Sequence, residues 1–131
     1  MIVIDTSALL AVLNAEPEEA VFSQVLAAST ACCISALSLF ETRIVLRARF
    51  SAAALLDLDE LLDQIQPEIV PFDAEQLAHA FAGFEKYSKG LGTGAKPNMG
   101  DCASYALAKS RNLPLLYKGD DFAATDIVSA T

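Results

Sequence analysis

Carboxylates directly follow two of the apolar runs of this chain, at positions where parallel strands would end. Asp5 comes after the β-branched run 2–4, and Asp120 and Asp121 come soon after the apolar run 113–117. In sheets of this kind, ligands gather beyond the carboxyl ends of the strands. Because hard divalent cations prefer oxygen ligands, acids collected at that edge could bind Mg²⁺ or Mn²⁺.

Asp101 is a further acid near an element boundary, in the first turn of a helix that Asn98 would cap. Each of these acids also has a purely structural explanation. Asp5 could cap the helix that follows it, the helix dipole favours Asp101, and turns favour acids such as Asp120. These explanations stay open, but they do not account for acids at the ends of so many elements.

Glu41 has no such explanation. On a helix, its neighbours three and four positions away are Leu37, Ile44 and Val45, so it lies along an apolar face. A carboxylate in that place must be paired, protonated or bound to a metal. The nearby cations in sequence are Arg43, Arg47 and Arg49. Because none of them is three or four positions from Glu41, a salt bridge on the same helix is disfavoured.

Acids that converged on one cleft would repel each other by roughly 3–4 kcal/mol per close pair at an effective dielectric constant near 20. That repulsion disappears when they share a divalent cation. Such a cation activates a water for attack on a phosphodiester and stabilises the leaving 3′-oxygen. Metal-assisted phosphodiester hydrolysis is therefore the chemistry that this set of acids favours.

Short apolar strands alternate with amphipathic helices along the chain. The predicted strands span 1–4, 31–34, 69–72, 113–117 and 127–128. The predicted helices span 8–13, about 16–26, about 35–50, 52–65, 74–86 and 99–111, and 87–98 is irregular. This order favours a three-layer α/β/α fold, a short, mostly parallel twisted sheet flanked by helices, in a single domain over 1–131.

The amino-acid composition excludes several other classes of protein and of site. The 131 residues are 53% hydrophobic and 20% charged, with a net charge of −8, which excludes a disordered chain. Three cysteines and one histidine exclude a disulfide framework and a zinc site, and favour a reducing cytoplasm. We expect His79 to be a helix-surface or half-buried residue rather than a catalytic base. The acidic balance argues against tight nonspecific binding of polyanions and suits a pocket for cations.

Residues 20–40 carry no charge over a length that could span a bilayer. Six polar side chains interrupt this stretch and no basic residue precedes it, so neither a signal peptide nor a membrane anchor is expected. The protein is expected to be soluble and cytoplasmic.

Four runs together resemble, in order and spacing, the PIN-domain VapC toxins of type II toxin–antitoxin systems. They are MIVIDTSAL (1–9), SALSLFE (35–41), NMGDCASYALA (98–108) and LLYKGDDFAATDI (115–127). The resemblance covers essentially the whole chain. It implies a PIN fold and a Mg²⁺- or Mn²⁺-dependent endoribonuclease that cuts structured RNA, often tRNA or rRNA. It also implies a homodimer, and inhibition by a VapB-type antitoxin whose C-terminal segment fills the acidic groove.

The same resemblance assigns roles to residues. It implies that Asp5, Glu41 and Asp101 are metal ligands and catalytic residues. The resemblance also implies a fourth catalytic acid, which follows the fourth strand of the chain. The remaining candidates for this acid and for supporting roles are Asp120, Asp121, Asp126, Thr6 and Ser7. Asp120 and Asp121 are both catalytic candidates, Asp126 is an additional acid near the site, and Thr6 or Ser7 supplies a hydroxyl that orients a ligand or water.

RNA binding by an acidic chain needs local cations rather than overall positive charge. The candidates are Arg43, Arg47, Arg49, Lys86, Lys89, Lys96 and Lys118. Each of them could equally be a solvated surface residue. The glycine-rich stretch 90–94 follows a helix and lacks a Gly-Lys-Ser/Thr ending, so we expect a loop beside the active site and not a nucleotide-binding loop.

Two other functions remain as alternatives. A phosphoryl-accepting receiver-like signalling domain also gathers acids around Mg²⁺, with Asp73 as the acceptor and Lys118 as its lysine. It would need paired acids after the first strand, which are missing, and it gives Glu41 no role. The other alternative is a catalytically inactive PIN-like binding protein, which the presence of all the required acids disfavours.

Overall fold

A sheet of four short parallel strands forms the centre of the protein, seen in a computed structural model that describes residues 1–87, 92–93, 96–97 and 99–131. In spatial order the strands are β3 (Glu68–Val70), β2 (Cys32–Ser35), β1 (Ile2–Ile4) and β6 (Leu115–Leu116). The central strand β1 is held on both sides, since Val3 lies opposite Cys33 in β2 and opposite Leu115 in β6.

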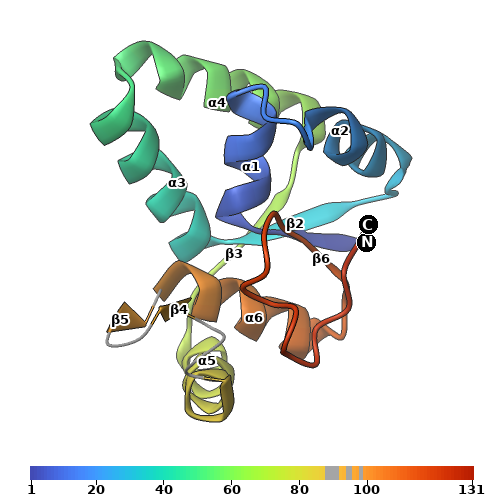
Figure 1. Cartoon of the computed structure of the whole chain (residues 1–131), viewed down its shortest axis with the longest axis vertical. Coiled ribbons are helices and arrows are strands. Elements are labelled where there is room, and N and C mark those ends of the chain that lie inside the picture. The colour runs from blue at the N-terminus through green and yellow to red at the C-terminus, as the bar shows by residue number, and fades with distance from the viewer. Residues whose placement is uncertain (88–91, 94–95, 98) are drawn as a thin grey trace.

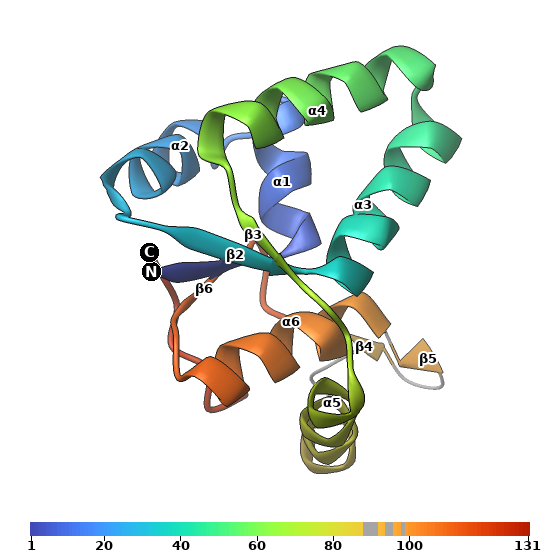
Figure 2. The same cartoon turned by 180° about the vertical axis from the view of Figure 1, so that it is seen from behind.

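Helices cover both faces of this sheet, which confirms the three-layer α/β/α prediction (Figure 1). One face carries α1 (Thr6–Leu13), α2 (Glu19–Ala28), α3 (Ala36–Arg49) and α4 (Ala52–Ile65). The other face carries α5 (Ala74–Tyr87) and α6 (Met99–Arg111). The view from behind shows the same division, with α5 and α6 together on one side of the strands (Figure 2).

The alternation of side chains along β1 divides the hydrophobic core in two. Ile2 and Ile4 pack on the side of α1 to α4, in a cluster that includes Leu9. Val3 points the other way and belongs to the cluster around Tyr105 of α6. Successive residues of a strand point to opposite faces, so a strand covered on both sides is apolar throughout.

Most predicted element bounds agree with the structure to within a few residues. The helices predicted at 52–65 and 99–111 have those bounds, as α4 and α6. The helix predicted to begin at residue 8 begins at Thr6, because the Asp5 side chain caps it. The structure has no strand at 127–128, contrary to the prediction; just after this stretch, Ser129 forms a single isolated parallel bridge with Leu115.

The segment predicted as irregular, 87–98, contains two paired strands. These are β4 (Gly92–Thr93) and β5 (Lys96–Pro97), which run antiparallel. The rest of the segment after Tyr87 lies outside the described residues. The uncharged stretch 20–40 is divided among α2, β2 and α3, and within the described ranges no helix is long and apolar enough to cross a membrane.

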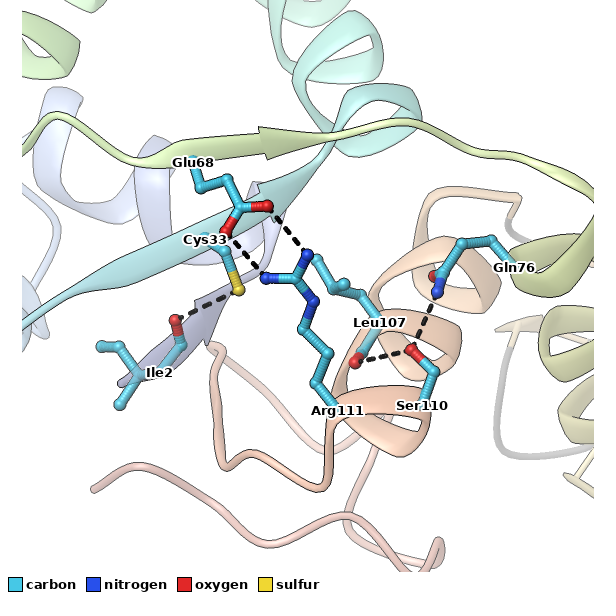
Figure 3. A network of polar contacts seen from close by, with 7 residues as sticks. All are labelled: Ile2, Cys33, Glu68, Gln76, Leu107, Ser110 and Arg111. Carbon is cyan, nitrogen blue, oxygen red and sulfur yellow. Dashed lines mark hydrogen bonds and ion pairs between the residues drawn. The ribbon is translucent and has the colours of Figure 1, made fainter.

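The far end of α6 is fixed by a polar network at the edge of the sheet (Figure 3). Arg111 donates two hydrogen bonds of 2.8 Å to the two carboxylate oxygens of Glu68 at the start of β3. Gln76 of α5 donates a hydrogen bond of 2.8 Å to the Ser110 hydroxyl. These contacts hold the α6 C-terminus against β3 and α5.

Helices α5 and α6 approach closely at Gly83. A Cβ atom at this position would lie 2.5 Å from the Cδ1 and Cε1 atoms of the Tyr105 ring. The ring has little freedom to move away, because its hydroxyl donates to Asp126 at 3.0 Å and it packs against Tyr87 with centroids 5.9 Å apart. Only glycine leaves room for the ring here.

We expect Gly83→Ala to destabilise the protein by about 1–3 kcal/mol, the usual cost of overpacking a tight contact. The free energy of unfolding in urea measures this effect. Ala82→Ser, at an exposed position of the same helix, is the control and should change the free energy by less than about 0.5 kcal/mol. A Gly83→Ala protein as stable as its parent would contradict the described packing of α5 on α6.

Candidate metal and phosphodiester site

Asp5 lies at the carboxyl end of β1, buried and held by several hydrogen bonds. The residue is 2% exposed. Oδ2 accepts hydrogen bonds from the Ser7 backbone nitrogen at 3.0 Å and from the Ser7 hydroxyl at 2.6 Å, so Asp5 does cap α1. Oδ1 accepts a hydrogen bond of 2.5 Å from the Ser104 hydroxyl of α6. Burial raises the pKa of Asp5, although the hydrogen bonds from Ser104 and Ser7 oppose that rise.

Glu41 of α3 extends over the first turn of α6, where Gly100 leaves room for it. A Cβ atom at Gly100 would lie 2.5 Å from the Cδ and Oε2 atoms of Glu41 and nearer still to Oε1. Burial raises the pKa of Glu41, and the charge of Asp5 raises it further. The salt bridge considered from the sequence does not form with Arg43, which pairs with Asp59 of α4 at 3.2 Å. Within the described part of the chain, no cation lies within 4.0 Å of the Glu41 carboxylate.

Asp101 is the acid whose pKa is affected by the charges of both Asp5 and Glu41. It is 5% exposed in the first turn of α6. Burial, followed by the charges of Asp5, Asp121 and Glu41, raises its pKa to about 8. Four carboxylates from β1, α3, α6 and the segment after β6 therefore share one region of negative potential. Of the two adjacent candidates in that last segment, it is Asp121 whose charge acts on Asp101.

The donor set of this region suits a hard divalent cation. All four side chains offer carboxylate oxygens. A cation would remove the repulsion that, after burial, contributes to the raised pKa values of Glu41 and Asp101. In the described residues, no three Asp, Glu, His or Cys side chains are placed so that they could hold one ion without moving. Because like charges repel, carboxylates without a cation are expected to stand further apart than they do around one.

Hydroxyl groups connect the elements behind the acids. The Ser7 hydroxyl accepts a hydrogen bond of 3.0 Å from the backbone of Lys118, after β6. The Thr6 hydroxyl donates to the Ser38 carbonyl at 2.9 Å. The Ser38 and Ser104 hydroxyls lie 3.0 Å apart and are fully buried. Sequence reasoning selected Thr6 and Ser7 but missed the roles of Ser38 and Ser104.

A signal for Ser104 was present in the sequence. It lies three positions after Asp101 on the same helix, so the two side chains share a face. Serine is too common in helices for that spacing to stand out. The partner across the interface, Asp5, is 99 positions away and comes into contact only through the fold.

Two other candidates, Asp126 and Lys118, form contacts with residues outside the group of four acids. Asp126 accepts hydrogen bonds from Tyr105 and Lys109, and the Lys109 ammonium lowers its pKa. The Lys118 ammonium forms ion pairs with Glu16 and Glu18. The structure therefore places Asp126 and the charged end of Lys118 in pairs of their own and does not join them to the four acids.

The remaining cations and the exposed acid are placed as follows. Asp120 is exposed, and its backbone carbonyl accepts from Ala123. Arg47 and Arg49 are exposed near the end of α3. Lys86 lies over the Tyr87 ring, 5.2 Å from its centroid. Lys89 lies outside the described residues, and of Lys96 only the backbone, in β5, is described.

The residues of the receiver-like alternative have structural roles. The Asp73 carboxylate accepts a hydrogen bond of 3.0 Å from the Gln76 backbone, as a cap of α5. Lys118 is paired with the acids of the α1–α2 connection. His79 is half-buried on α5, with Nε2 4.0 Å from a Glu75 oxygen, in agreement with the prediction for that residue.

The raised pKa of Asp101 predicts how stability depends on pH. A carboxyl whose pKa is higher in the folded chain stabilises the fold below its unfolded pKa, near 4, and loses that contribution as pH rises through the folded value, about 8. We expect the melting temperature in EDTA to fall between pH 5 and pH 8, and to fall less in Asp101→Asn. Thermal denaturation at several pH values checks this, with Asp63→Asn on exposed α4 as the control. Equal slopes in parent and Asp101→Asn would contradict the placement of Asp101.

Comparison with known proteins agrees with this fold. The family model of the PIN domain matches residues 2–128. Ribonuclease VapC30 of Mycobacterium tuberculosis is 41% identical over 127 residues, which cover 97% of this chain and 96% of that protein. The structure of VapC20 of the same organism, a sarcin–ricin loop cleaving toxin, superposes with a TM-score of 0.78 at 18% identity, covering 98% of this chain and 97% of that one.

A second solved structure contains a partner. VapBC2 of Rickettsia felis, bound to a DNA fragment from the promoter of the pair, matches with a TM-score of 0.73 at 20% identity over 98% of this chain and 96% of that one. The resemblance found in the sequence is confirmed by the family match and by the extent of the identity. The chain belongs to the PIN-domain family, within its group of VapC ribonucleases.

Proposed function

We propose that the protein is an endoribonuclease that hydrolyses RNA phosphodiester bonds with Mg²⁺ or Mn²⁺ held by Asp5, Glu41, Asp101 and Asp121. The observation that carries this proposal is the convergence of the acids on the first turns of α6, where Glu41 lies against Gly100 and Asp5 is held by Ser104. Burial and the charges of Asp5, Asp121 and Glu41 raise the pKa of Asp101 there to about 8. These acids come from four parts of the chain, and no arginine or lysine is described among them. Their charges therefore repel each other, and a bound cation would remove that repulsion.

Each residue has a part in this mechanism. When bound, the cation would lower the pKa of a water for attack on the phosphorus and stabilise the leaving oxygen. Asp5 is fixed in direction by Ser7 and Ser104 and provides the rigid side of the site. Glu41 and Asp121 provide the more exposed side, where substrate enters. Of the adjacent acids, we propose Asp121 rather than Asp120 as the fourth catalytic residue, because the charge of Asp121 is among the main causes of the raised pKa of Asp101.

We propose structured RNA, such as tRNA or rRNA, as the substrate. The name of VapC30 describes a ribonuclease, and VapC20 is described as cleaving the sarcin–ricin loop. Arg47 and Arg49, exposed on the helix that carries Glu41, are the proposed phosphate contacts among the described residues. The ammonium of Lys118 and the guanidinium of Arg43 are held in ion pairs and are weaker candidates.

We further propose a VapB-type antitoxin as the partner, by analogy with the Rickettsia complex. A basic segment of such a partner would be attracted by the same negative potential that suits the cation. A homodimer is proposed as well, supported by Leu77 and Phe81 of α5, which are 58% and 57% exposed and line one apolar hollow together with Met99. The three buried free cysteines support a cytoplasmic location.

Cleavage of RNA by the purified, antitoxin-free chain tests the proposed function. We expect cleavage with Mg²⁺ or Mn²⁺, loss of cleavage in EDTA, and recovery when the cation is returned in excess. Mapping the 5′ ends of the products on total RNA identifies the substrate. Full cleavage in EDTA would reject the proposed mechanism, and no cleavage under any condition would favour the inactive binding protein.

A further inference from the structure

Ser104 and Ser38 form a buried hydrogen-bond chain that ends on Asp5 and that the proposed function does not yet use. Ser104 donates its one hydroxyl proton to Oδ1 of Asp5 at 2.5 Å. The Ser38 hydroxyl, 3.0 Å from the Ser104 hydroxyl, must then be the donor of that second bond. The direction of both bonds is therefore fixed, from α3 through α6 to the end of β1. Both serines are 0% exposed, so water does not compete for these bonds.

The Ser38 end of the chain is itself held in place. Its backbone carbonyl accepts hydrogen bonds of 2.9 Å from the Thr6 hydroxyl and from the Thr42 hydroxyl. These contacts tie the first turn of α1 to α3. The chain thus couples the positions of three elements, α1, α3 and α6, each of which carries or adjoins one of the proposed ligands Asp5, Glu41 and Asp101.

The hydrogen bonds also decide which part of Asp5 can bind a cation. A carboxylate has about four lone-pair positions in its plane. Ser7 occupies two positions on Oδ2, with its backbone nitrogen and its hydroxyl, and Ser104 occupies one on Oδ1. These three bonds leave a position on Oδ1, the oxygen that Ser104 holds. Fixing that oxygen fixes the ligand atom.

We infer that Ser104, supported by Ser38, is a positioning residue that orients Oδ1 of Asp5 toward a divalent cation. The inference rests on the proposed function, because it assumes that Asp5 is a ligand. Residues that hold a metal ligand by a hydrogen bond contribute to affinity without touching the metal, and removing one costs about 10- to 100-fold in affinity or activity. Polarisation along a buried chain adds to the strength of its last bond.

The test measures Mn²⁺ affinity of the full chain by calorimetry, without substrate. We expect Ser104→Ala to raise the Mn²⁺ dissociation constant about 10- to 100-fold, and Ser38→Ala to raise it by a smaller factor. The Mg²⁺ concentration that half-saturates RNA cleavage should rise by the same factor as the dissociation constant, while the rate at saturating Mg²⁺ stays within a few-fold of the parent. Ser110→Ala is the matched control on α6, since its hydroxyl bonds to Leu107 and Gln76 at the far end of the helix (Figure 3).

The outcomes separate the inference from the proposed function. If the parent and Ser110→Ala bind Mn²⁺ and both Ser104→Ala and Ser38→Ala bind it equally well, the positioning role is wrong and the nuclease proposal stands. If the parent binds no Mn²⁺, both are wrong. Thermal denaturation accompanies each titration: a loss of affinity in Ser104→Ala with a melting temperature near that of the parent supports the inference. Should Ser104→Ala fail to fold, Ser38→Ala decides, and unchanged Mn²⁺ affinity in that variant overturns the inference.

Discussion

Asp5→Asn is expected to reduce RNA cleavage about 10³-fold or more while the protein stays folded. The change removes the negative charge that a cation needs, and it also removes repulsion with Asp101 and Glu41. Asn can keep the cap of α1 if its oxygen faces Ser7 and its amide faces Ser104, because the hydroxyls of Ser104 and Ser38 can reverse their donor direction. The melting temperature in EDTA should therefore equal or exceed that of the parent.

The measurement is the initial rate of RNA cleavage at saturating Mg²⁺, together with the melting temperature. Asp63→Asn, on the exposed side of α4, removes the same charge away from the site and should cleave like the parent. Asp121→Asn and Asp120→Asn resolve the fourth acid, since only the former should lose most of its activity. An Asp5→Asn protein with parental activity would exclude Asp5 from catalysis.

Gly100→Ala is expected to lower cleavage about 10²-fold or more with almost no loss of stability. The added methyl group would occupy the place of the Glu41 carboxylate. That carboxylate is the end of a flexible side chain, so it can turn away without disturbing the backbone, and alanine is a better helix former than glycine. The fold survives this change, but Glu41 leaves the acidic site. Rates of RNA cleavage and the free energy of unfolding in urea measure the two effects.

A double-mutant cycle shows whether the effect acts through Glu41. Gly100→Ala should cost little activity in a Glu41→Gln background, because the residue it displaces has already lost its function. Gly83→Ala is an informative contrast, since it adds the same methyl group to a neighbouring helix and should lower stability rather than the activity of the folded protein. Full additivity of Gly100→Ala and Glu41→Gln would contradict the described contact.

The sequence predicted the main acids of the site and the helices and strands that carry them, because these depend on local patterns. The apolar neighbours of Glu41 marked it as an acid out of place, and the structure brings it over the first turn of α6. The run 2–4 followed by Asp5 predicted a carboxylate at the end of a buried strand. Helix periodicity placed α4 and α6 at their observed bounds.

Details of the site depended on geometry that no local pattern contains. The turn after β6 passes through Gly119 at a φ of +92°, and of the two acids that follow it, Asp121 is the one whose charge contributes to the raised pKa of Asp101. Asp126 was a reasonable candidate by position, yet Lys109 on α6 pairs with it. Ser104 could not be selected because its partner, Asp5, is distant in sequence.

Asp5, Glu41 and Asp101 are proposed to bind a divalent cation jointly. An anomalous difference map from a crystal soaked in Mn²⁺ tests it most directly, because Mn²⁺ can be located independently of the protein atoms. We predict one peak or two neighbouring peaks beside Oδ1 of Asp5, at ligand distances of about 2.0–2.3 Å from carboxylate oxygens of this set. Peaks only at other surfaces, or none at a Mn²⁺ concentration that supports cleavage, would contradict joint binding of the cation by these three acids.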